Sequence, residues 1–491
     1  MMKLNELLSC LPFYQVSKKI DDVQINSIEM DSRKVTNGSL FVCIKGFTVD
    51  GHDFAEQAIN NGARAIIAEK ELNVSVPVIV VSDTSRVLAM LAVKFLQNPS
   101  KGLSLFGVTG TNGKTTVTYL LEAIFDQHKE KTGLIGTIQM KIGDKAYPIN
   151  NTTPNALVLQ QMFKDMAEES VDHVFMEVSS HALDQERVFG TDFDVAIFTN
   201  LSQDHLDYHK NMDDYLRAKS LLFAQLGNTY DGRRKYAIIN EDDSSSDLLK
   251  RSTAQHVLTY GCQNKADVMA TNIKLDITKT TFTLETPKGS VEITSRLIGM
   301  FNVYNMLAAS SAAIVKDVPL NTIKEALENV KGVHGRFEPV LAGQPYAVIV
   351  DYAHTPDSLE NVLQTIKEFA EQKVYVVIGC GGDRDRAKRP LMAQIAVNYA
   401  DQAIFTSDNP RTEDPRIILD DMVNGLTEVE QNYEVIVNRK EAINEAINKA
   451  NKEDVILIAG KGHETYQQIG HEKYDFDDCE VAKEAIFNKE K

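Results

Sequence analysis

Short apolar runs alternate along the chain with longer segments that have the periodicity of amphipathic helices. In the middle of the sequence, strands are expected at residues 103–108, 174–178, 195–199 and 236–239, with helical patterns between them. The alternation returns later in the chain, with strands expected at 347–350, 374–378, 403–406 and 455–458. Strands that alternate with helices are typical of parallel sheets, so both regions predict α/β units.

The other segments indicate a smaller unit at the start and an antiparallel region in the middle. Residues 1–98 carry apolar runs at 38–44 and 76–81 and a helical pattern at 87–96. A hairpin is expected from the alternating segments 273–285 and 289–293, and a helix from 303–315.

Chain length and turn chemistry divide the sequence into three expected domains. The 491 residues correspond to about three domains of ~150 residues. The turn-forming segment 98–102 marks the first boundary, and a third unit starts near Gly332. We expect an α/β protein whose central, mostly parallel phosphate-loop sheet lies between a small N-terminal α/β domain and a Rossmann-like C-terminal one. The expected ranges are 1–98, 99–332 and 333–491.

Composition narrows the class of protein and its setting. With 43% apolar and 25% charged residues, the chain has the balance of a globular protein. The sequence shows neither a secretory leader nor an apolar stretch of about 18 residues, so we expect neither export nor membrane insertion. A formal net charge of −17 argues against nucleic acid as a partner. The five cysteines form no C-x-x-C pair, which indicates a reducing cytoplasm without disulfides or zinc.

The turn between the first central strand and its helix carries a glycine-rich phosphate loop, residues 110–115. Backbone N–H groups at the start of a helix stabilise phosphate. Lys114 can then reach the outer phosphates of ATP, and Thr115 can bind Mg²⁺. The longer form of the motif is not met, because Val108 stands where a glycine is expected. A chance glycine turn is the alternative, but strand, turn and helix all favour nucleotide binding.

Two polar segments follow neighbouring strands at the edge where ligands gather in parallel sheets. Glu177 ends one strand and His205 follows the next, so the two side chains can share a magnesium site beside the phosphate loop. A solvated carboxylate and a structural histidine are the alternative interpretations.

Four segments together resemble the Mur ligases, and the resemblance spans nearly the whole chain. They are residues 109–115, 177–181, 200–209 and 351–356. The chain looks closest to the members that extend UDP-N-acetylmuramoyl-L-alanyl-D-glutamate by one amino acid. The resemblance implies that ATP phosphorylates the D-glutamyl side-chain carboxylate and that an amine attacks the resulting acyl phosphate. Such a reaction needs no nucleophilic Ser or Cys on the protein. The resemblance also implies that the three domains bind, in chain order, the UDP-muramoyl substrate, ATP and the amino acid.

The resemblance also implies which residues act on ATP. Lys219 lies where the family carries a carbamylated lysine, which would join Thr115, Glu177 and His205 as a magnesium ligand; a surface lysine is the alternative. The implied catalytic residues are Lys114, Glu177, His205 and Lys219. The implied ATP contacts are Gly110, Thr111, Asn112, Gly113, Lys114, Thr115, Thr116, Asn302, Asn305, Arg336 and Asp351. Without the family, Asn302 is a helix cap and Arg336 a linker charge.

A further set is implied for the nucleotide-sugar substrate. Hydroxyls, amides and a guanidinium suit a diphosphate and a carboxylate. The set is Ser32, Phe47, Thr48, Val49, Asn151, Thr152, Thr153, Ser179, Gln185 and Arg187. Without the family, residues 151–154 are a turn and Ser32 a possible helix cap.

Two arginines near the ends of C-terminal strands indicate which amine is added. Arg384 and Arg411 are both expected at one sheet edge, where two guanidinium forks suit an amine that carries two carboxylates. This favours meso-diaminopimelate over lysine, as the family's Asp-Asn-Pro-Arg motif also implies. The implied contacts are Arg384, Asp408, Asn409, Pro410, Arg411, Gly460 and Glu464. The alternative pairs Arg411 with Glu413 or Asp414 at the surface.

Other functions stay open at this point. They are a lysine-adding ligase, a ligase like folylpolyglutamate synthetase, and a non-enzymatic nucleotide-binding scaffold. The expected partners are the small-molecule substrates UDP-N-acetylmuramoyl-L-alanyl-D-glutamate and meso-diaminopimelate, and a monomer is expected.

Overall fold

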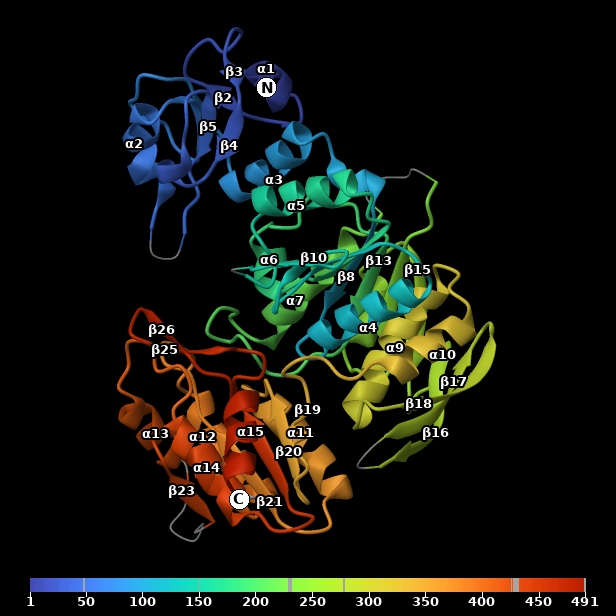
Figure 1. The fold of residues 1–491 in the computed structure, drawn as a ribbon. Coiled ribbons are helices and arrows are strands. Elements are labelled where there is room, and N and C mark those ends of the chain that lie inside the picture. The colour runs from blue at the N-terminus through green and yellow to red at the C-terminus, as the bar shows by residue number, and fades with distance from the viewer. Residues whose placement is uncertain are drawn as a thin grey trace.

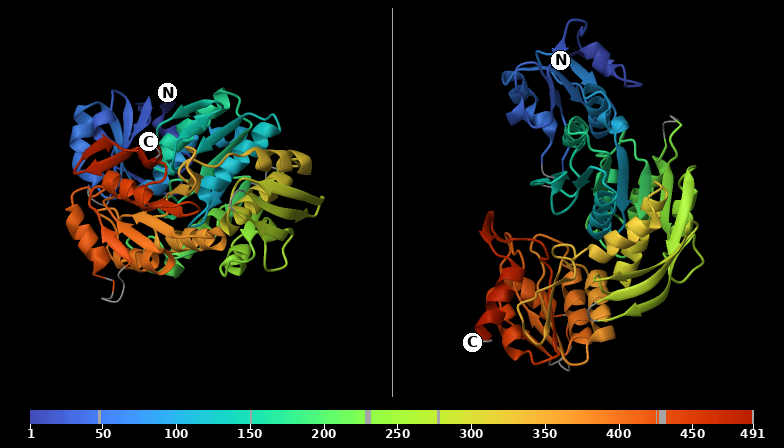
Figure 2. Two further views of the ribbon diagram at one scale, coloured as in Figure 1. Left: turned by 60° about the horizontal axis from the view of Figure 1, so that its bottom comes forward. Right: turned by 45° about the vertical axis from the view of Figure 1, so that its right-hand side comes forward.

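The computed structural model describes residues 1–46, 49–149, 151–227, 232–276, 279–424, 426 and 432–489. The chain forms three α/β units in sequence order, with the central unit between the other two (Figure 1). A second view shows the three units arranged in an open arc (Figure 2). The predicted α/β class is therefore observed in each part of the chain.

The N-terminal unit is built on a five-stranded sheet in the order β2-β7-β6-β5-β4. Its pairs are parallel except for the edge pair of β2 and β7. The strands are β2 (Gln15–Val16), β4 (Ser27–Glu29), β5 (Ser39–Val42), β6 (Ala63–Ala68) and β7 (Val78–Val80), with a separate pair β1 (Met2–Lys3) and β3 (Gln24–Ile25). The helices are α1 (Leu4–Leu8), α2 (Ala55–Asn60) and α3 (Thr84–Phe95).

The central unit contains an eleven-stranded sheet whose middle is parallel and whose edges are antiparallel. The order is β11-β10-β9-β12-β8-β13-β14-β15-β16-β17-β18. The parallel strands are β8 (Ser104–Thr109), β9 (Thr132–Ile135), β12 (His173–Glu177), β13 (Val195–Phe198), β14 (Tyr236–Asn240), β15 (His256–Gly261) and β16 (Val268–Leu275). The edge strands are β10 (Met140–Ile142), β11 (Lys145–Tyr147), β17 (Thr280–Thr286) and β18 (Gly289–Ser295).

Helices cover both faces of this sheet. One hydrophobic core packs α4 (Lys114–Gln127), α9 (Met300–Ile314) and α10 (Leu320–Asn329) against one face. A second core packs α5 (Ala156–Glu168), α7 (Met212–Ala224) and α8 (Ser246–Arg251) against the other, with the short α6 (Ser180–Asp184) after β12. The chain runs from β8 outward to β9 and β12 and later returns to β13 on the other side of β8. Such a switch point opens a crevice at the carboxyl ends of the strands, and the phosphate loop follows β8 there.

The C-terminal unit is a six-stranded sheet in the order β19-β20-β24-β21-β22-β23, parallel except for β19. Its strands are β19 (Glu338–Pro339), β20 (Ala347–Asp351), β21 (Val374–Ile378), β22 (Gln402–Phe405), β23 (Tyr433–Val435) and β24 (Val455–Ala459). One face carries α11 (Pro356–Phe369), α12 (Lys388–Tyr399) and α13 (Pro415–Val423), and the other α14 (Arg439–Lys449) and α15 (Asp478–Lys489). A hairpin of β25 (Tyr466–Ile469) and β26 (Glu472–Asp475) extends from it.

Two sequence predictions about the central unit are corrected. The segment 273–285 is not one strand: Ile273 lies in β16, and β17 begins at Thr280. The apolar positions shift from odd numbers up to Ile277 to even numbers from Phe282, so the strict alternation breaks inside this segment. The helix expected from residue 303 begins at Met300, with Gly299 as its N-cap. No helix among the described residues is long and apolar enough to span a membrane.

Candidate active site

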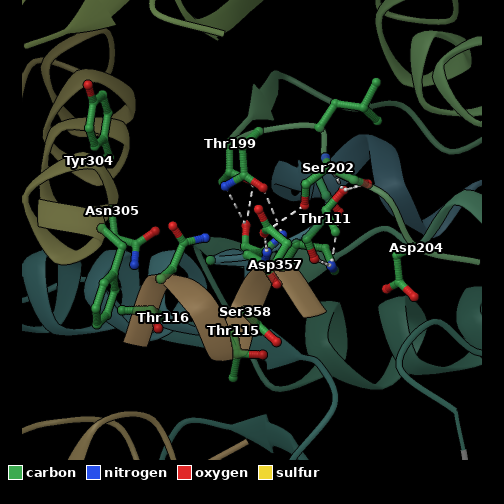
Figure 3. Close-up of a pocket in the computed structure, with 18 of the residues that line it drawn as sticks. Thr111, Thr115, Thr116, Thr199, Ser202, Asp204, Tyr304, Asn305, Asp357 and Ser358 are labelled. Carbon is green, nitrogen blue, oxygen red and sulfur yellow. Dashed lines mark hydrogen bonds between the residues drawn. The ribbon is translucent and has the colours of Figure 1, made fainter. Parts of the chain in front are cut away.

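A cavity of about 580 Å³ lies between the central and C-terminal units, and Figure 3 shows part of its polar lining. It is lined by the loop after β8, the ends of β12 and β13, and helices α9 and α11. Of the residues expected to bind ATP or magnesium, all but Asn302 line this cavity. Thr152 and Ser179 from the expected UDP-substrate set line it as well.

The phosphate loop is held in shape by the segment after β13. Helix α4 begins at Lys114, whose Nζ donates to the carbonyls of Gly110 at 2.9 Å and Thr111 at 2.6 Å. The Thr111 N–H donates to the Asn200 carbonyl, and the Asn112 N–H donates to Asn200 Oδ1 at 2.9 Å. Asn200 therefore fixes the loop at the positive end of α4, where a phosphate group is stabilised.

Gly113 and helix α9 fit together closely beside the loop. Gly113 has φ +87°, and a Cβ there would lie 2.3 Å from Asn305 Oδ1, so a larger residue would clash. Asn305 Nδ2 donates to Asn302 Oδ1, and Asn302 Nδ2 donates to the Ile298 carbonyl at 2.9 Å. Asn302 lies inside α9 and is not its cap, so the cap interpretation is wrong. It orients Asn305, which faces the cavity.

Glu177 is the centre of a buried network at the end of β12. Its Oε2 accepts from Thr115 Oγ1 at 3.1 Å and from Thr137 Oγ1 at 3.0 Å, and its Oε1 accepts from the Thr137 N–H at 2.7 Å. Glu177 is 1% exposed, so these donors offset the cost of burying its charge. Thr115 and Glu177, both expected to bind magnesium, therefore touch.

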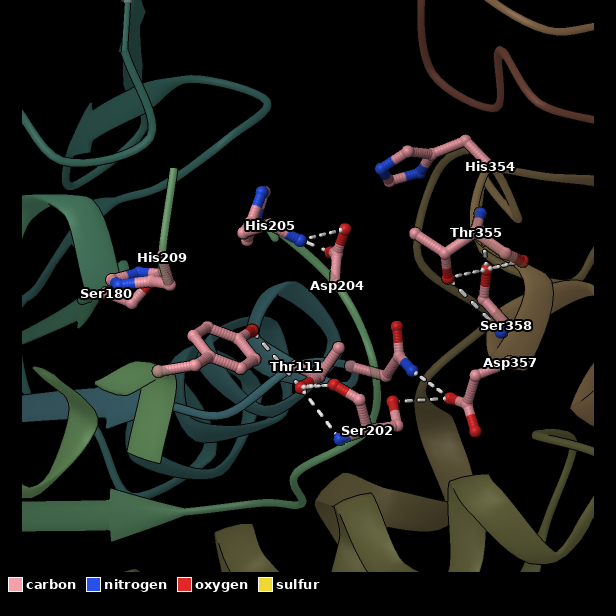
Figure 4. Close-up of polar contacts among 12 residues, drawn as sticks. Thr111, Ser180, Ser202, Asp204, His205, His209, His354, Thr355, Asp357 and Ser358 are labelled. Carbon is pink, nitrogen blue, oxygen red and sulfur yellow. Dashed lines mark hydrogen bonds and ion pairs between the residues drawn. The ribbon is translucent and has the colours of Figure 1, made fainter. Parts of the chain in front are cut away.

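His205 and Lys219 lie elsewhere on the wall of the same cavity. His205 Nε2 lies 3.4 Å from Asp204 Oδ2 (Figure 4). Burial lowers the pKa of His205 to about 4, so the ring is neutral at pH 7, which is the form that binds metals. Lys219 comes from α7, is 1% exposed and donates to the Gly110 carbonyl at 2.7 Å. The interpretation of Lys219 as a surface lysine is wrong.

Burial and the nearby charge of Lys114 disfavour the ammonium form of Lys219, although the ring of Tyr215 offers it a cation–π contact. Its Nζ lies 4.3 Å from the Tyr215 ring centroid, and burial, followed by the charge of Lys114, lowers its pKa well below the usual range. Among the described residues, no group of three or more His, Cys, Asp or Glu side chains gathers as a metal site. The oxygen donors of Thr115 and Glu177 fit the preference of Mg²⁺ for hard ligands.

The C-terminal unit reaches the phosphate loop through two contacts. Arg336 Nη2 donates to Thr115 Oγ1 at 3.2 Å, so the interpretation of Arg336 as a linker charge is wrong. Asp357, in the first turn of α11, accepts at Oδ2 from Asn112 Nδ2 at 2.7 Å and from Ser202 Oγ at 2.8 Å (Figure 4).

Asp351 supports the first of these contacts. Its carboxylate accepts from the Phe337 and Ala353 N–H groups at 2.6 and 2.7 Å, which anchors the loop that carries Arg336.

The residues expected to bind the UDP substrate form one cluster and several separate sites. Thr153 Oγ1 donates to the Glu177 carbonyl at 2.8 Å, and Arg187 bonds both the Thr153 carbonyl and Gln185 Oε1. Ser179 Oγ caps α6 by accepting from the Ala182 N–H.

Of the other members, Thr152 joins the same network and the rest lie apart. Thr152 Oγ1 is 3.1 Å from Thr137 Oγ1, and Asn151 is exposed. Ser32 lies in the N-terminal unit, where its hydroxyl donates to Gln57 Oε1; Asp31 caps that turn, so the cap interpretation of Ser32 is wrong. Val49, in the same unit, is exposed, and Phe47 and Thr48 lie outside the described residues.

The residues expected to bind the amino acid meet at the carboxyl end of the C-terminal sheet. A Cβ on Gly381 would lie 2.9 Å from Arg411 Nη1 and 3.9 Å from Arg384 Cγ, so both arginines border the same loop. Asn409 Nδ2 donates to Glu464 Oε2 at 2.7 Å. A Cβ on Gly460 would lie 2.9 Å from Asp408 Oδ2, and a Cβ on Gly382 would lie 1.9 Å from the Pro410 carbonyl oxygen.

The alternative interpretation, in which Arg411 pairs with Glu413 or Asp414 at the surface, is wrong. Its Nη1 donates to the Gly382 carbonyl at 2.8 Å. Glu413 instead pairs with the buried Arg389 at 2.8 Å, and Asp414 caps α13. Arg411 is therefore not neutralised by either carboxylate.

The cavity and the residues expected to bind the amino acid are connected through contacts of Arg336, Tyr352 and His463. The Arg336 guanidinium lies 4.3 Å from the Tyr352 ring centroid, and the Tyr352 and His463 rings lie 5.0 Å apart. His463 belongs to the loop that carries Gly460 and Glu464. One continuous layer thus connects the phosphate loop to the loop of Gly460 and Glu464.

Comparisons with known proteins agree with this geometry. Residues 24–96 match the Mur ligase family catalytic domain, residues 108–313 the Mur ligase middle domain, and residues 335–462 the Mur ligase glutamate ligase domain. The chain belongs to the Mur ligase family. The predictions of this family and of the three-part α/β architecture are both confirmed.

Relatives and solved structures in the family are similar over the full chain. The UDP-N-acetylmuramoyl-L-alanyl-D-glutamate--2,6-diaminopimelate ligase of Oceanobacillus iheyensis is 64% identical, covering 99% of this chain and 100% of the relative. The enzyme of the same name from Bacillus cereus is 59% identical, covering 99% and 98%. A solved structure of a ligase with this name has a TM-score of 0.70 at 34% identity, covering 99% of each chain.

A more distant likeness shows the fold alone. A folylpolyglutamate synthase of Mycobacterium tuberculosis, solved with ADP and AMPPCP, has a TM-score of 0.63 at 17% identity and covers 77% of this chain and 92% of that one.

Within this Mur ligase, several residues that the sequence analysis did not select contact those that it did. They are Thr137, Asn200, Asp204, Asp357 and Lys461. Asn200 and Asp204 lie in a segment that carries the family resemblance, directly after β13, so their position after a parallel strand was a usable signal. Thr137 follows the parallel strand β9, which the sequence analysis did not predict, and Asp357 directly follows the segment 351–356 that carries the family resemblance.

Proposed function

We propose that the chain is the ATP-dependent ligase that joins meso-diaminopimelate to the D-glutamyl side-chain carboxylate of UDP-N-acetylmuramoyl-L-alanyl-D-glutamate, a step in peptidoglycan precursor synthesis. The observation that carries the proposal is the continuous layer of Arg336, Tyr352 and His463 between the phosphate loop and the loop of Glu464. An activated carboxylate formed at the first site can thereby meet an amine held at the second. Relatives with that name at 53–64% identity over 99% of this chain support the assignment.

Each unit has one proposed role. Residues 1–98 bind the UDP-muramoyl part, residues 99–332 bind ATP, and residues 333–491 bind the amino acid. Ser32 and Val49 serve the first role, together with Phe47 and Thr48. The residues around Thr153 and Arg187 continue the substrate path towards Glu177, because Thr153 donates to the Glu177 carbonyl.

The first half of the reaction takes place at the phosphate loop. The backbone N–H groups of the loop and Lys114 hold the phosphates of ATP while a substrate carboxylate oxygen attacks the terminal phosphorus and ADP leaves. Mg²⁺, held by Thr115, Glu177, His205 and a carbamylated Lys219, would neutralise phosphate charge. Arg336 brings a second cation from the C-terminal unit to the same point, 3.2 Å from Thr115 Oγ1.

The second half of the reaction depends on the C-terminal site. The amine nitrogen attacks the acyl carbon, the carbon–oxygen bond to phosphate breaks, and inorganic phosphate leaves with the proton passing to solvent. Arg384 and Arg411 bind carboxylates of diaminopimelate, and Glu464 binds an ammonium group of the same molecule. An acyl phosphate hydrolyses in water, so domain contacts such as Asp357 with Asn112 protect it by closing the cavity.

ADP release tests this function directly. The protein is incubated with ATP, Mg²⁺ and the UDP-muramoyl dipeptide, and diaminopimelate is compared with lysine and with a folate plus glutamate. We expect release with diaminopimelate only, and a product that contains both substrates. Release with lysine would support a lysine-adding ligase, release with folate the folylpolyglutamate alternative, and ATP binding without a product the scaffold.

The setting of the enzyme is proposed as well. We place it in the cytoplasm as a monomer acting on small molecules, a setting suited to five cysteines that are all free thiols. Sedimentation equilibrium measures the oligomeric state, and a dimer at working concentration would contradict this part.

A further inference from the structure

Lys461 is a fully buried lysine behind the proposed amino-acid site. It is 0% exposed, and its Nζ donates to Asn409 Oδ1 at 3.1 Å and to Glu464 Oε2 at 3.1 Å. The ring of Tyr466 lies 5.4 Å from the same atom. Burying an ammonium is costly, so its stability depends on the hydrogen-bond partners that surround it.

The three polar groups form a closed triangle. Asn409 Nδ2 donates to Glu464 Oε2 at 2.7 Å, so that oxygen accepts from both Asn409 and Lys461. Asn409 Oδ1 accepts from Lys461 and from the Gln468 N–H at 2.8 Å. With two donors on its oxygen, the Asn409 amide can only present its NH₂ group to Glu464.

The triangle fixes which atom of Glu464 faces outward. Its Oε2 is bound on the inside, while Oε1 has no protein partner in the part of the chain that the structure describes. The Glu464 side chain is 16% exposed, so Oε1 is the oxygen available to a ligand. Lys461 is fully buried on the inner side of Asn409 and Glu464, so it does not reach a ligand itself.

The triangle also controls the charge of the site. Glu464 and the neighbouring Asp408 both lie at the carboxyl end of this sheet, and Lys461 is the cation that bonds Glu464. Without it, the site would be more negative, which disfavours a ligand with two carboxylates relative to a ligand with one.

We propose that Lys461 is a positioning residue that sets the preference of this site for an amine with two carboxylates over one with a single carboxylate. It acts by holding Asn409 and Glu464 in one orientation and by offsetting the charge of Glu464. The inference rests on the proposed function, because it takes diaminopimelate as the ligand of the site.

The test compares the full-length protein with Lys461→Met, which keeps the length of the side chain and removes its charge and donors. We expect the KM for diaminopimelate to rise about tenfold, the size of effect that loss of one hydrogen bond to a charged group produces. The KM for ATP should stay unchanged. The ratio of kcat/KM for diaminopimelate to that for lysine should fall by a similar factor.

Two controls separate positioning from a general loss of stability. Lys235 is also buried, at 1% exposed, and pairs with Asp192 and Asp194 far from this site. Lys235→Met should lower Tm without changing the ratio. In a double-mutant cycle with Glu464→Gln, the second substitution should add little, since Lys461 acts through Glu464.

The outcomes are distinguishable. A folded Lys461→Met protein with an unchanged KM for diaminopimelate and an unchanged ratio would overturn the inference, as would an equal rise in the KM for ATP. If Lys461→Met does not fold, Lys461→Gln keeps an N–H donor without the charge and is measured in the same way. Failure of the wild-type protein to release ADP with diaminopimelate would instead reject the proposed function.

Discussion

Arg411 offers the sharpest test of how the amine is chosen. Its backbone is held by β25, because its N–H donates to the Gln468 carbonyl and its carbonyl accepts from the Gly470 N–H. Its Nη1 donates to the Gly382 carbonyl at 2.8 Å. In the described part of the chain, the Nε and Nη2 atoms have no protein acceptor. That edge of the guanidinium is therefore available for a bidentate contact with a carboxylate.

The magnitude follows from the number of bonds at that edge. A hydrogen bond to a charged group contributes about 1.5–3 kcal/mol, so two at the lower limit contribute about 3 kcal/mol. Since 1.4 kcal/mol corresponds to a factor of ten, Arg411→Ala should reduce kcat/KM for diaminopimelate by about 150-fold. The backbone should not contribute, because Arg411 has φ +51° and alanine carries the same Cβ penalty there.

The assay is ADP release at limiting diaminopimelate, with Tm measured on every variant. Arg386→Ala is the matched control, since Arg386 is a 61% exposed arginine of the same unit that pairs with Asp421. It should leave kcat/KM unchanged. Arg411→Lys should resemble Arg411→Ala, because an ammonium cannot make the bidentate contact. A folded Arg411→Ala protein with wild-type kcat/KM for diaminopimelate would refute the reasoning.

Three further predictions concern the cavity. Asp357→Ala removes the acceptor of the bonds from Asn112 and Ser202, about 1–3 kcal/mol each, and should increase the radius of gyration measured by small-angle scattering; an unchanged radius would contradict it. Isotopically labelled bicarbonate should give a carbamate NMR signal in the wild type and none in Lys219→Met. Equal labelling of the two proteins would contradict carbamylation of Lys219. Burial lowers the pKa of His354 to about 4, so the unfolded state binds the extra proton below pH 6.5 and stability falls as the pH drops from 6.5 towards 4. In His354→Asn this fall in Tm should be smaller, and an identical pH profile would show that His354 is not responsible.

The features that the sequence determined are those whose residues are neighbours in the chain. The phosphate loop was readable because strand, turn and helix follow one another within residues 103–125. The alternation of strands and helices predicted two parallel sheets for the same reason, since each period is a local property. In the segment 273–285, where the apolar positions shift parity between Ile277 and Phe282, the prediction of one strand was wrong.

Only the tertiary structure decided which distant side chains share a network. Asp357 bonds Asn112 across 245 positions of sequence, and Lys461 bonds Asn409 across 52. Parallel sheets bring the ends of separate strands to one edge, but the packing of helices decides which side chains meet there and which are buried. Lys219 illustrates the difference: its match to the family position was evident from sequence, whereas its burial against Tyr215 and the Gly110 carbonyl follows from how α7 packs beneath the phosphate loop.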